Sequence, residues 1–355
     1  MMSKYIPCLK TKTNELNAFS WIPLDVRAGV CPLFDVHRGD HMDATAFPVY
    51  VAKLQRSFAK HLKGLAEFYC DNYDVGDDLL IGGDCNYKYL LSQLTAQPVV
   101  PVVGIDRKPV HNSAVLDLKT AGQIESSTVA FRVTPEEFES FGAVEDDIDD
   151  ELSAVFQQFE TVDLILDCRM CRNANAVGVA GTIVDFVRGF IVKYATRRVV
   201  VTGSSIPATI SDLVKVDHEY TLVRTEIEIC GNVSKSLSDV NLCFGDYATV
   251  SPYYSDVKIP MYAMQNVMTA KFTYSHDDKH YFIRGGSLKV KGRGQYRTLA
   301  QILCAKPFFR GQGYSLGDNY FHEKSLGQGA DGAPNSVLKP SIVSHISFVV
   351  RNSPI

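Results

Sequence analysis

The sequence predicts an α/β protein, namely a (β/α)8 barrel of the TIM type that carries a C-terminal appendage with a hairpin. Short apolar runs recur about eight times along the first 250 residues, and helical or loop segments separate them. Continuous runs of Val, Ile and Leu are typical of strands that are buried on both faces, as in a parallel sheet. The regular alternation of strand and helix over this length favours a closed barrel.

The apolar runs place the predicted strands. We expect strands near residues 4–11, 30–36, 79–84, 98–105, 128–134, 162–168, 198–203 and 240–247. Most runs end in a charged or small polar residue, and these residues are Lys10, Asp35, Asp84, Asp106, Arg132, Asp167, Ser204 and Asp246. Because the C-terminal ends of barrel strands meet at one mouth, we expect these side chains to form a ring there.

Helical patterns fill most intervals between the strands. Apolar residues spaced by three and four predict a long helix over residues 44–72, and further helices are expected over 13–20, 87–94 and 178–194 and near 114–118. Residues 134–137 place a proline and two acids where a helix would start, and the acidic block at 145–151 continues that helix to Phe159. Residues 203–207 precede a predicted helix over 206–222.

The last third of the chain follows the eighth predicted strand. We expect a β-hairpin over residues 271–284, a helix over 298–305, a long Gly-rich loop over 311–335 and a closing strand at 346–350. The predicted organisation is therefore a barrel core over residues 1–250 and a C-terminal extension over 251–355 that packs on the barrel.

Composition narrows the class of protein. The formal charge of −4 provides no global basic field that would recruit nucleic acid. Nine scattered cysteines, several inside apolar runs, indicate reduced thiols rather than a disulfide framework. Because no run of 18 apolar residues occurs and the N-terminal residues lack an apolar signal core, we expect a soluble cytoplasmic protein with no membrane partner.

Short segments spread over most of the chain carry a resemblance to a known family. They are residues 5–12 with Glu15 and Ala18, residues 32–35 and 203–207, Arg224 with Glu226, and residues 244–247, 284–285, 317–318 and 345–346. In these segments the sequence resembles the phage "beta protein" family. The resemblance implies an accessory gene of phages, satellites or prophages that lies near toxic or abortive-infection genes. It implies no particular chemistry.

The predicted ring of strand ends supports two kinds of chemistry. Its carboxylates could hold a divalent metal, or they could pair with Lys10 and Arg132 as a neutral network. Alternatively, Lys10 and Arg132 could clasp a phosphate while the amides of Ser204 and Ser205 form an anion site at a helix start. A register difference of one residue would turn any single member of the ring outward.

Two sets of site residues follow from these alternatives. For an enzyme, the catalytic candidates are Asp35, Asp84, Asp167 and Asp246. For a binding protein, the ligand-binding candidates are Lys10, Lys12, Arg132, Ser204, Ser205, Asp246, Tyr247, Tyr274 and Arg284. The sequence does not identify a cofactor, and a divalent metal remains possible.

Three weaker motifs stand outside the ring. His37 and His41 with their flanking acids have ligand types suited to a transition metal, and Cys168 and Cys171 form a lone C-x-x-C pair. A basic cluster follows the predicted hairpin, with aromatic residues nearby, and single-stranded nucleic acid uses such a combination. Its members are Arg284, Lys289, Lys291, Arg293 and Arg297.

Three functional hypotheses remain open at this point. The first is a phage-defence or immunity protein whose barrel mouth binds a phosphate-bearing ligand, either a nucleotide or nucleic acid. The second is a metal-dependent phosphodiesterase or nucleotide hydrolase that uses the strand-end carboxylates. The third is a protein-only antitoxin that covers a toxin with its appendage. In the third case we expect internally paired mouth carboxylates and an exposed apolar patch on the appendage.

Overall fold

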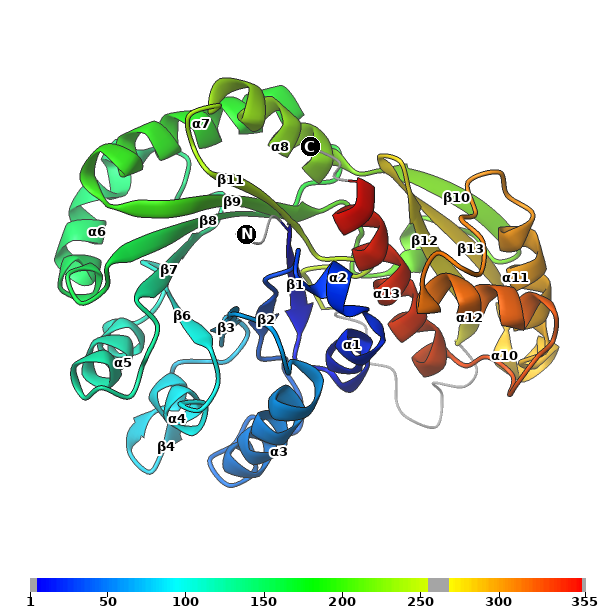
Figure 1. Cartoon of the computed structure of the whole chain (residues 1–355), viewed down its shortest axis with the longest axis horizontal. Coiled ribbons are helices and arrows are strands. Elements are labelled where there is room, and N and C mark those ends of the chain that lie inside the picture. Colours follow the sequence, from blue (N-terminus) through cyan, green and yellow to red (C-terminus); the bar gives the residue numbers. More distant parts are fainter. Residues whose placement is uncertain (1–4, 255–267, 353–355) are drawn as a thin grey trace.

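The computed structural model describes residues 5–254 and 268–352, and it confirms the predicted (β/α)8 barrel. Eight parallel strands close the barrel in the order β1-β11-β9-β8-β7-β6-β3-β2 (Figure 1). The strands are β1 (Tyr5–Lys10), β2 (Leu33–Asp35), β3 (Phe68–Asp71), β6 (Val99–Val103), β7 (Thr128–Val133), β8 (Thr161–Met170), β9 (Thr196–Ser204) and β11 (Leu242–Asp246). The first and last strands meet because Tyr5 pairs with Phe244.

The predicted third strand over residues 79–84 is wrong. The true third strand is β3, and the predicted helix over 44–72 therefore ends earlier, since α3 covers only Ala46–His61. Phe68 and Tyr69 continue the apolar spacing of the helix, which hides the change of period from 3.6 to 2. Residues 79–85 instead form a small antiparallel ribbon of β4 (Leu80–Ile81) and β5 (Asp84–Cys85) at the surface.

Helices cover the outside of the barrel. After α1 (Thr13–Ala18) with η1 (Phe19–Trp21) and α2 (Leu24–Arg27), the outer layer continues through α3, α4 (Asn86–Gln93), α5 (Pro109–Thr120), α6 (Phe141–Phe156), α7 (Ala176–Lys193) and α8 (Thr225–Ser236). The predicted helix start at residues 134–137 is wrong, because this segment is a turn and α6 begins at Phe141.

The predicted helix over residues 206–222 is also wrong. This segment contains the short η2 (Ile210–Asp212) and then β10 (His218–Val223), which leaves the barrel. β10 joins β12 (Thr269–His276) and β13 (Lys279–Ser287) in a separate sheet of order β10-β13-β12. The hairpin prediction is confirmed, since β12 and β13 pair antiparallel around the turn at Asp277 and Asp278.

We call β10 and the elements from β12 to α12, which lie outside the barrel, the insertion. The remaining helices complete the insertion and return the chain to the barrel. They are α10 (Leu288–Lys291), α11 (Gln295–Cys304), α12 (Leu316–Ser325) and α13 (Pro334–Asn352). The predicted closing strand at 346–350 is wrong because these residues lie in α13, and the predicted loop at 311–335 contains α12. In Figure 1, α13 lies between the barrel and the small sheet. It contacts both α1 and β12, so it acts as the eighth outer helix of the barrel.

Two apolar layers are separated by the barrel wall. The outer layer lies between strands and helices and includes Phe34, Phe131, Phe190 and, from α13, Ile346. The inner layer fills the barrel with Ile6, Cys8, Leu33, Tyr69, Val100, Val102, Ala130, Ile165, Val200 and Cys243. Within the described residues, no helix has the length and apolar character needed to cross a membrane.

Candidate functional site

The alternation of side chains along each strand decides which polar residues face the barrel interior. On β7, Ala130 lies in the inner apolar layer, so Arg132 faces inward one layer nearer the mouth. The same period places other polar side chains above the inner layer. These side chains are Lys10, Asp35, Asp71, Asp167, Thr202 and Tyr247, and all of them are buried. The mouth is thus a polar layer directly above an apolar barrel interior.

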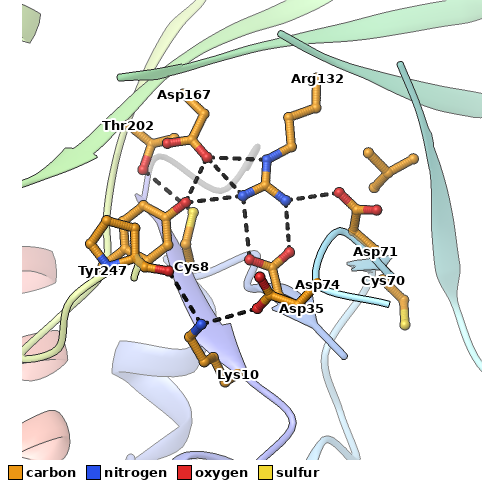
Figure 2. Close-up of polar contacts among 12 residues, drawn as sticks. Cys8, Lys10, Asp35, Cys70, Asp71, Asp74, Arg132, Asp167, Thr202 and Tyr247 are labelled. Atoms are coloured by element: carbon orange, nitrogen blue, oxygen red, sulfur yellow. Dashed lines mark hydrogen bonds and ion pairs between the residues drawn. The ribbon is translucent and has the colours of Figure 1, made fainter. Parts of the chain in front are cut away.

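Arg132 is the hub of this layer (Figure 2). Its Nη1 donates to Asp35 Oδ1 at 2.7 Å and to Asp71 Oδ2 at 2.8 Å, and its Nη2 donates to Asp167 Oδ2 at 2.7 Å. Nη2 also reaches the hydroxyl of Tyr247 at 3.0 Å, and that hydroxyl donates to Asp167 at 2.6 Å. One guanidinium therefore joins carboxylates from three different strands.

Two further arginines lie between this hub and solvent. Arg107 binds Asp71 at 3.0 Å, and Arg169 donates to the Tyr247 hydroxyl at 2.8 Å. The ring of Tyr73 contacts all three guanidiniums, with its centroid 4.6 Å from Arg107, 4.8 Å from Arg132 and 4.3 Å from Arg169. The Nε atoms of Arg107 and Arg169 are buried without a hydrogen-bond partner among the described residues.

The backbone of β8 aims Arg169 into the mouth. The strand register shifts between Asp167 and Met170, and Arg169 adopts φ of 50°, a left-handed conformation that is unfavourable for a side chain of this size. Its amide donates to Asp167 Oδ1 at 2.9 Å, which holds the bulge. Strained backbone of this kind persists where surrounding contacts fix it, often at functional sites.

The loop after β11 covers one side of the mouth. The carbonyl oxygen of Pro252 accepts from Lys10 Nζ at 3.2 Å and from Arg169 Nη2 at 3.3 Å. Lys10 also pairs with Asp74 at 3.0 Å, and the Tyr254 hydroxyl donates to the same carboxylate at 2.9 Å. A single neutral acceptor oxygen is therefore held between two cations.

Burial and charge shift the ionisation of the mouth in opposite directions. Burial would raise the pKa of Asp71 and Asp167, but the neighbouring arginines outweigh it and hold the pKa of both carboxyls below its usual range. Burial raises the pKa of Asp35 despite its contact with Arg132, and burial lowers the pKa of Lys10. The mouth is thus a paired ionic network and not a set of free carboxylates.

The pKa of His111 on α5 is affected by the charge of Arg107, so this residue can test how burial and the arginines shift ionisation near the mouth. It is fully buried, it stacks on Tyr87, and its Nε2 donates to the Val102 carbonyl at 3.0 Å. Burial, with a contribution from Arg107, lowers its pKa to about 4. Because the unfolded chain binds this proton near pH 6.5 and the folded chain does not, stability falls as pH drops from about 6.5 to about 4.

We therefore expect His111→Gln to remove part of the acid sensitivity. Between pH 7 and pH 5 the native protein should lose about 2 kcal/mol more unfolding free energy than the variant, measured by urea denaturation. An equal loss in both proteins would contradict the buried, neutral state of His111.

A second buried cluster lies outside the barrel wall, at the junction with the insertion. Asp246 points outward because it is one residue out of phase with Tyr247. Its carboxylate accepts from Tyr5 at 2.6 Å, from His345 Nε2 at 2.9 Å and from Arg224. Although burial raises the pKa of Asp246, its contacts with His345, Arg224 and Tyr5 lower it far more, so the carboxyl stays ionised.

The contacts of this junction cluster continue into the small sheet. Because a carboxylate can only accept, His345 carries its proton on Nε2, and its Nδ1 accepts from the Ser275 hydroxyl at 2.6 Å. His280 Nδ1 then donates to Ser275 at 2.9 Å. Ser275, His345 and Asp246 are each at most 1% exposed, so this Ser-His-Asp chain ties α13 and β12 to the barrel and does not face substrate.

The structure brings together only some of the residues predicted for the site. Lys10, Asp35, Arg132, Asp167 and Tyr247 share the mouth. Lys12 lies at the rim, where its Nζ is 5.1 Å from the Tyr254 ring.

Other predicted site residues lie elsewhere, which corrects the ring. Asp84 lies on the surface ribbon beside Lys88, with 66% of its side chain exposed, and Asp246 faces the junction. Ser204 and Ser205 are buried, and the residues that follow them, 206–209, are not helical. Their hydroxyls instead bind the Val250 carbonyl and Glu226, so the predicted anion site of free helix amides is absent.

Two predicted ligand residues belong to the insertion. The Tyr274 hydroxyl donates to Asp318 at 2.6 Å inside the insertion core. Arg284 donates to the Val214 carbonyl at 2.9 Å and to Thr269 at 3.1 Å. Neither residue has a contact with the mouth among the hydrogen bonds of the described chain.

The sequence interpretation missed Asp71, Tyr73, Arg107 and Arg169. Asp71 ends the run Phe68–Asp71 in the same way that Asp35 ends its strand, so a shorter α3 would have revealed it. Arg107 follows Asp106 in the loop after β6, and Arg169 gains its position only from the bulge in β8. A bulge of this kind has no local sequence signal.

The weaker metal motifs receive no support from the geometry. His41 Nε2 bonds the His37 carbonyl at 2.9 Å, and the ring of His41 stacks on Tyr50. All nine cysteines are free thiols, including Cys168 and Cys171. Across residues 5–254 and 268–352, no three His, Cys, Asp or Glu side chains are arranged to hold a metal ion.

Fold and site together define a (β/α)8-barrel protein with an arginine-centred mouth and an inserted sheet that is closed by the last helix. Comparison with known families agrees with the resemblance in the sequence: the Beta protein family profile matches residues 5–351. The chain therefore belongs to the Beta protein family. No curated protein and no solved structure matches it significantly.

Proposed function

We propose that this protein is a phage-defence or immunity component of a mobile-element module, and that its barrel mouth binds a small phosphate-bearing ligand such as a nucleotide. The genetic context is the one that the resemblance to phage beta proteins implies. The ligand class rests on the mouth, and chiefly on one contact.

That contact is the Pro252 carbonyl between Lys10 and Arg169. Phosphate oxygens are stronger acceptors than a neutral carbonyl and favour lysine and arginine partners. A phosphate oxygen that replaced the carbonyl would keep both donors and add a favourable charge interaction. The loop of residues 247–254 would then open as the ligand enters.

The surroundings of this position suit the rest of a nucleotide. The unpaired Nε atoms of Arg107 and Arg169 offer further donors beside the Tyr73 ring. The centroid of the Tyr253 ring lies 5.3 Å from the guanidinium carbon of Arg169, so this guanidinium is close to two aromatic rings, those of Tyr73 and Tyr253. Bases stack readily on such rings and on guanidinium planes. The side chains of Arg107 and Arg169 are only 7% exposed, so the entrance favours a small ligand over a polymer.

Replacing Arg169 tests this proposal. Titration calorimetry with inorganic phosphate and with the ribonucleoside mono- and triphosphates should detect binding of at least one of them to the native protein. Arg169→Gln should weaken that binding at least about tenfold, since one charge-assisted contact contributes roughly 1.5–3 kcal/mol. Arg188→Gln is the matched control, because Arg188 forms an exposed ion pair on the far surface with Asp239.

The alternatives predict different outcomes. If a folded Arg169→Gln variant binds as well as the native protein, the mouth proposal fails. If no phosphate compound binds the native protein, the protein-only antitoxin becomes the better hypothesis. One feature that it requires is present, namely paired mouth carboxylates. The apolar side chains of Val216, Tyr220 and Val223 on and beside β10 are also exposed, but Tyr220 and Val223 lie on opposite faces of the strand.

The metal-dependent phosphodiesterase has less support. Of its four candidate carboxylates, Asp84 and Asp246 are outside the mouth, while Asp35 and Asp167 are engaged by Arg132. A metal ion there would have to replace a guanidinium that already satisfies these oxygens.

A further inference from the structure

Positive charge is concentrated in one part of the insertion. Residues 279–317 contain eight lysines and arginines and no aspartate or glutamate, in a chain whose net charge is −4. This stretch covers β13, α10 and α11. Its charge therefore contrasts with that of the rest of the molecule.

Acidic partners neutralise only part of this charge. Lys279 pairs with Asp278, Lys291 with Asp217, Lys306 with Glu219, and Arg310 with Asp318. Arg293 and Arg297 have no carboxylate within ion-pair distance among the described residues, and both are exposed. Among the described residues, the hydrogen-bond acceptors of Arg284 are two neutral oxygens, and Arg284 lies directly opposite Lys271 on β12. Like charges opposite each other across a sheet are unfavourable without a counter-charge.

Two cavities lie on either side of α11. One, of about 330 Å³, is lined along β13 and β10 by Arg284, Lys291 and Gln295, and also by Asp217 and Glu219, whose charges are paired with Lys291 and Lys306. The other, of about 360 Å³, is lined by Arg297, Lys324 and the glycine-rich segment 327–332, which includes one acid, Asp331. Gly327 and Gly329 adopt φ of 74° and 69°, which only glycine adopts readily, so the backbone approaches Arg297 closely.

We propose that this basic face, formed by Arg284, Arg293, Arg297 and Lys324, binds the phosphate backbone of a nucleic acid. Cations in two hollows with further cations between them suit a chain of evenly spaced phosphates better than one compact anion. Backbone contacts of this kind carry no sequence information, so binding is independent of base sequence. This site is separate from the barrel mouth and does not depend on the function proposed there.

The test is fluorescence anisotropy with labelled 20-nucleotide single-stranded DNA, single-stranded RNA and duplex DNA on the intact protein. Binding to at least one of them should weaken with salt. For three or four phosphate contacts, the slope of log K against log salt should be about −2 to −3 for a single strand and about −3 to −4 for duplex DNA. Arg293→Ala with Arg297→Ala should lower the affinity at least about tenfold and reduce the slope by about 1.5. The three probes distinguish the kind of nucleic acid.

Matched variants separate a local site from general electrostatics. Lys60→Ala with Lys63→Ala removes the same charge from exposed positions at the end of α3 and should leave binding unchanged. Arg293→Lys with Arg297→Lys should retain it, because phosphate contacts depend mainly on charge. Equal losses in both alanine pairs, unchanged affinity in the arginine pair, or no binding at 50 mM salt would each overturn the proposal. Arg169→Gln, which alters the barrel mouth, should bind nucleic acid with native affinity. A negative result at the basic face would therefore leave the mouth proposal standing, and the reverse also holds.

Discussion

Replacing Arg132 with alanine should destabilise the protein more than any other single substitution in the barrel. The side chain is fully buried and satisfies Asp35, Asp71 and Asp167 together. Its loss leaves three buried carboxylates without their shared cation, and removing one partner of a buried ion pair costs about 3–5 kcal/mol. We expect the unfolding free energy from urea denaturation to fall by at least about 4 kcal/mol.

The attribution to unpaired charge can be checked in the same background. Arg132→Met combined with Asp35→Asn and Asp71→Asn removes most of the unpaired charge and should recover a large part of the lost stability. Arg188→Ala, at the exposed pair with Asp239, should leave the unfolding curve unchanged. If Arg132→Ala alone unfolds like the native protein, the mouth is not held together by this hub.

Asp246→Asn should have the second largest effect, and a more local one. The substitution keeps the size of the side chain but removes the charge that Arg224 and His345 face in the junction. Arg224 is fully buried, and among the described residues it would keep Glu226, at 3.2 Å, as its one acidic partner. We expect a loss of about 3 kcal/mol in unfolding free energy. Amide hydrogen exchange should also quicken first in α13 and β12, the two elements that the cluster joins to the barrel.

Asp84→Asn is the matched control for this prediction. It makes the same chemical change at a strand-end aspartate, but Asp84 is exposed on the surface ribbon. It should leave both the unfolding curve and the hydrogen exchange of α13 unaltered. Equal behaviour of the two variants would mean that the junction cluster does not hold the insertion on the barrel.

The sequence predicts the barrel because strands that are buried on both faces appear in the sequence as continuous apolar runs. Seven of the eight barrel strands coincide with apolar runs, and the alternation of strand and helix is confirmed. The sequence does not reveal β3, because this strand follows α3 after a short turn and its aromatic residues continue the apolar spacing of the helix. β10 escaped because it belongs to a sheet whose other strands lie more than forty residues later, a long-range pairing without a local signal.

The site is harder to predict than the fold, because the direction in which a strand side chain points depends on the exact register of the strand. Asp246 and Tyr247 are neighbours, yet one faces the junction and the other the mouth. A run of apolar residues gives the position of a strand to within a residue or two, and a shift of one residue is enough to turn a side chain to the other face. Lys10, Asp35, Arg132 and Asp167 were placed correctly within the mouth, whereas Arg169 required knowledge of a bulge.

The position of α13 has a consequence for biosynthesis. The helix α13, which packs on α1 in the outer layer, is synthesised after every strand of the barrel and after the elements from β12 to α12. Until then, the apolar side chains of Leu16, Ala18 and Phe19 that belong to the same cluster as Ile346 lack their cover. A chain that stops before α13 would therefore expose these apolar side chains although all eight barrel strands are present. Cellular chaperones and proteases act on such incompletely folded chains. Only translation through α13 buries this apolar surface.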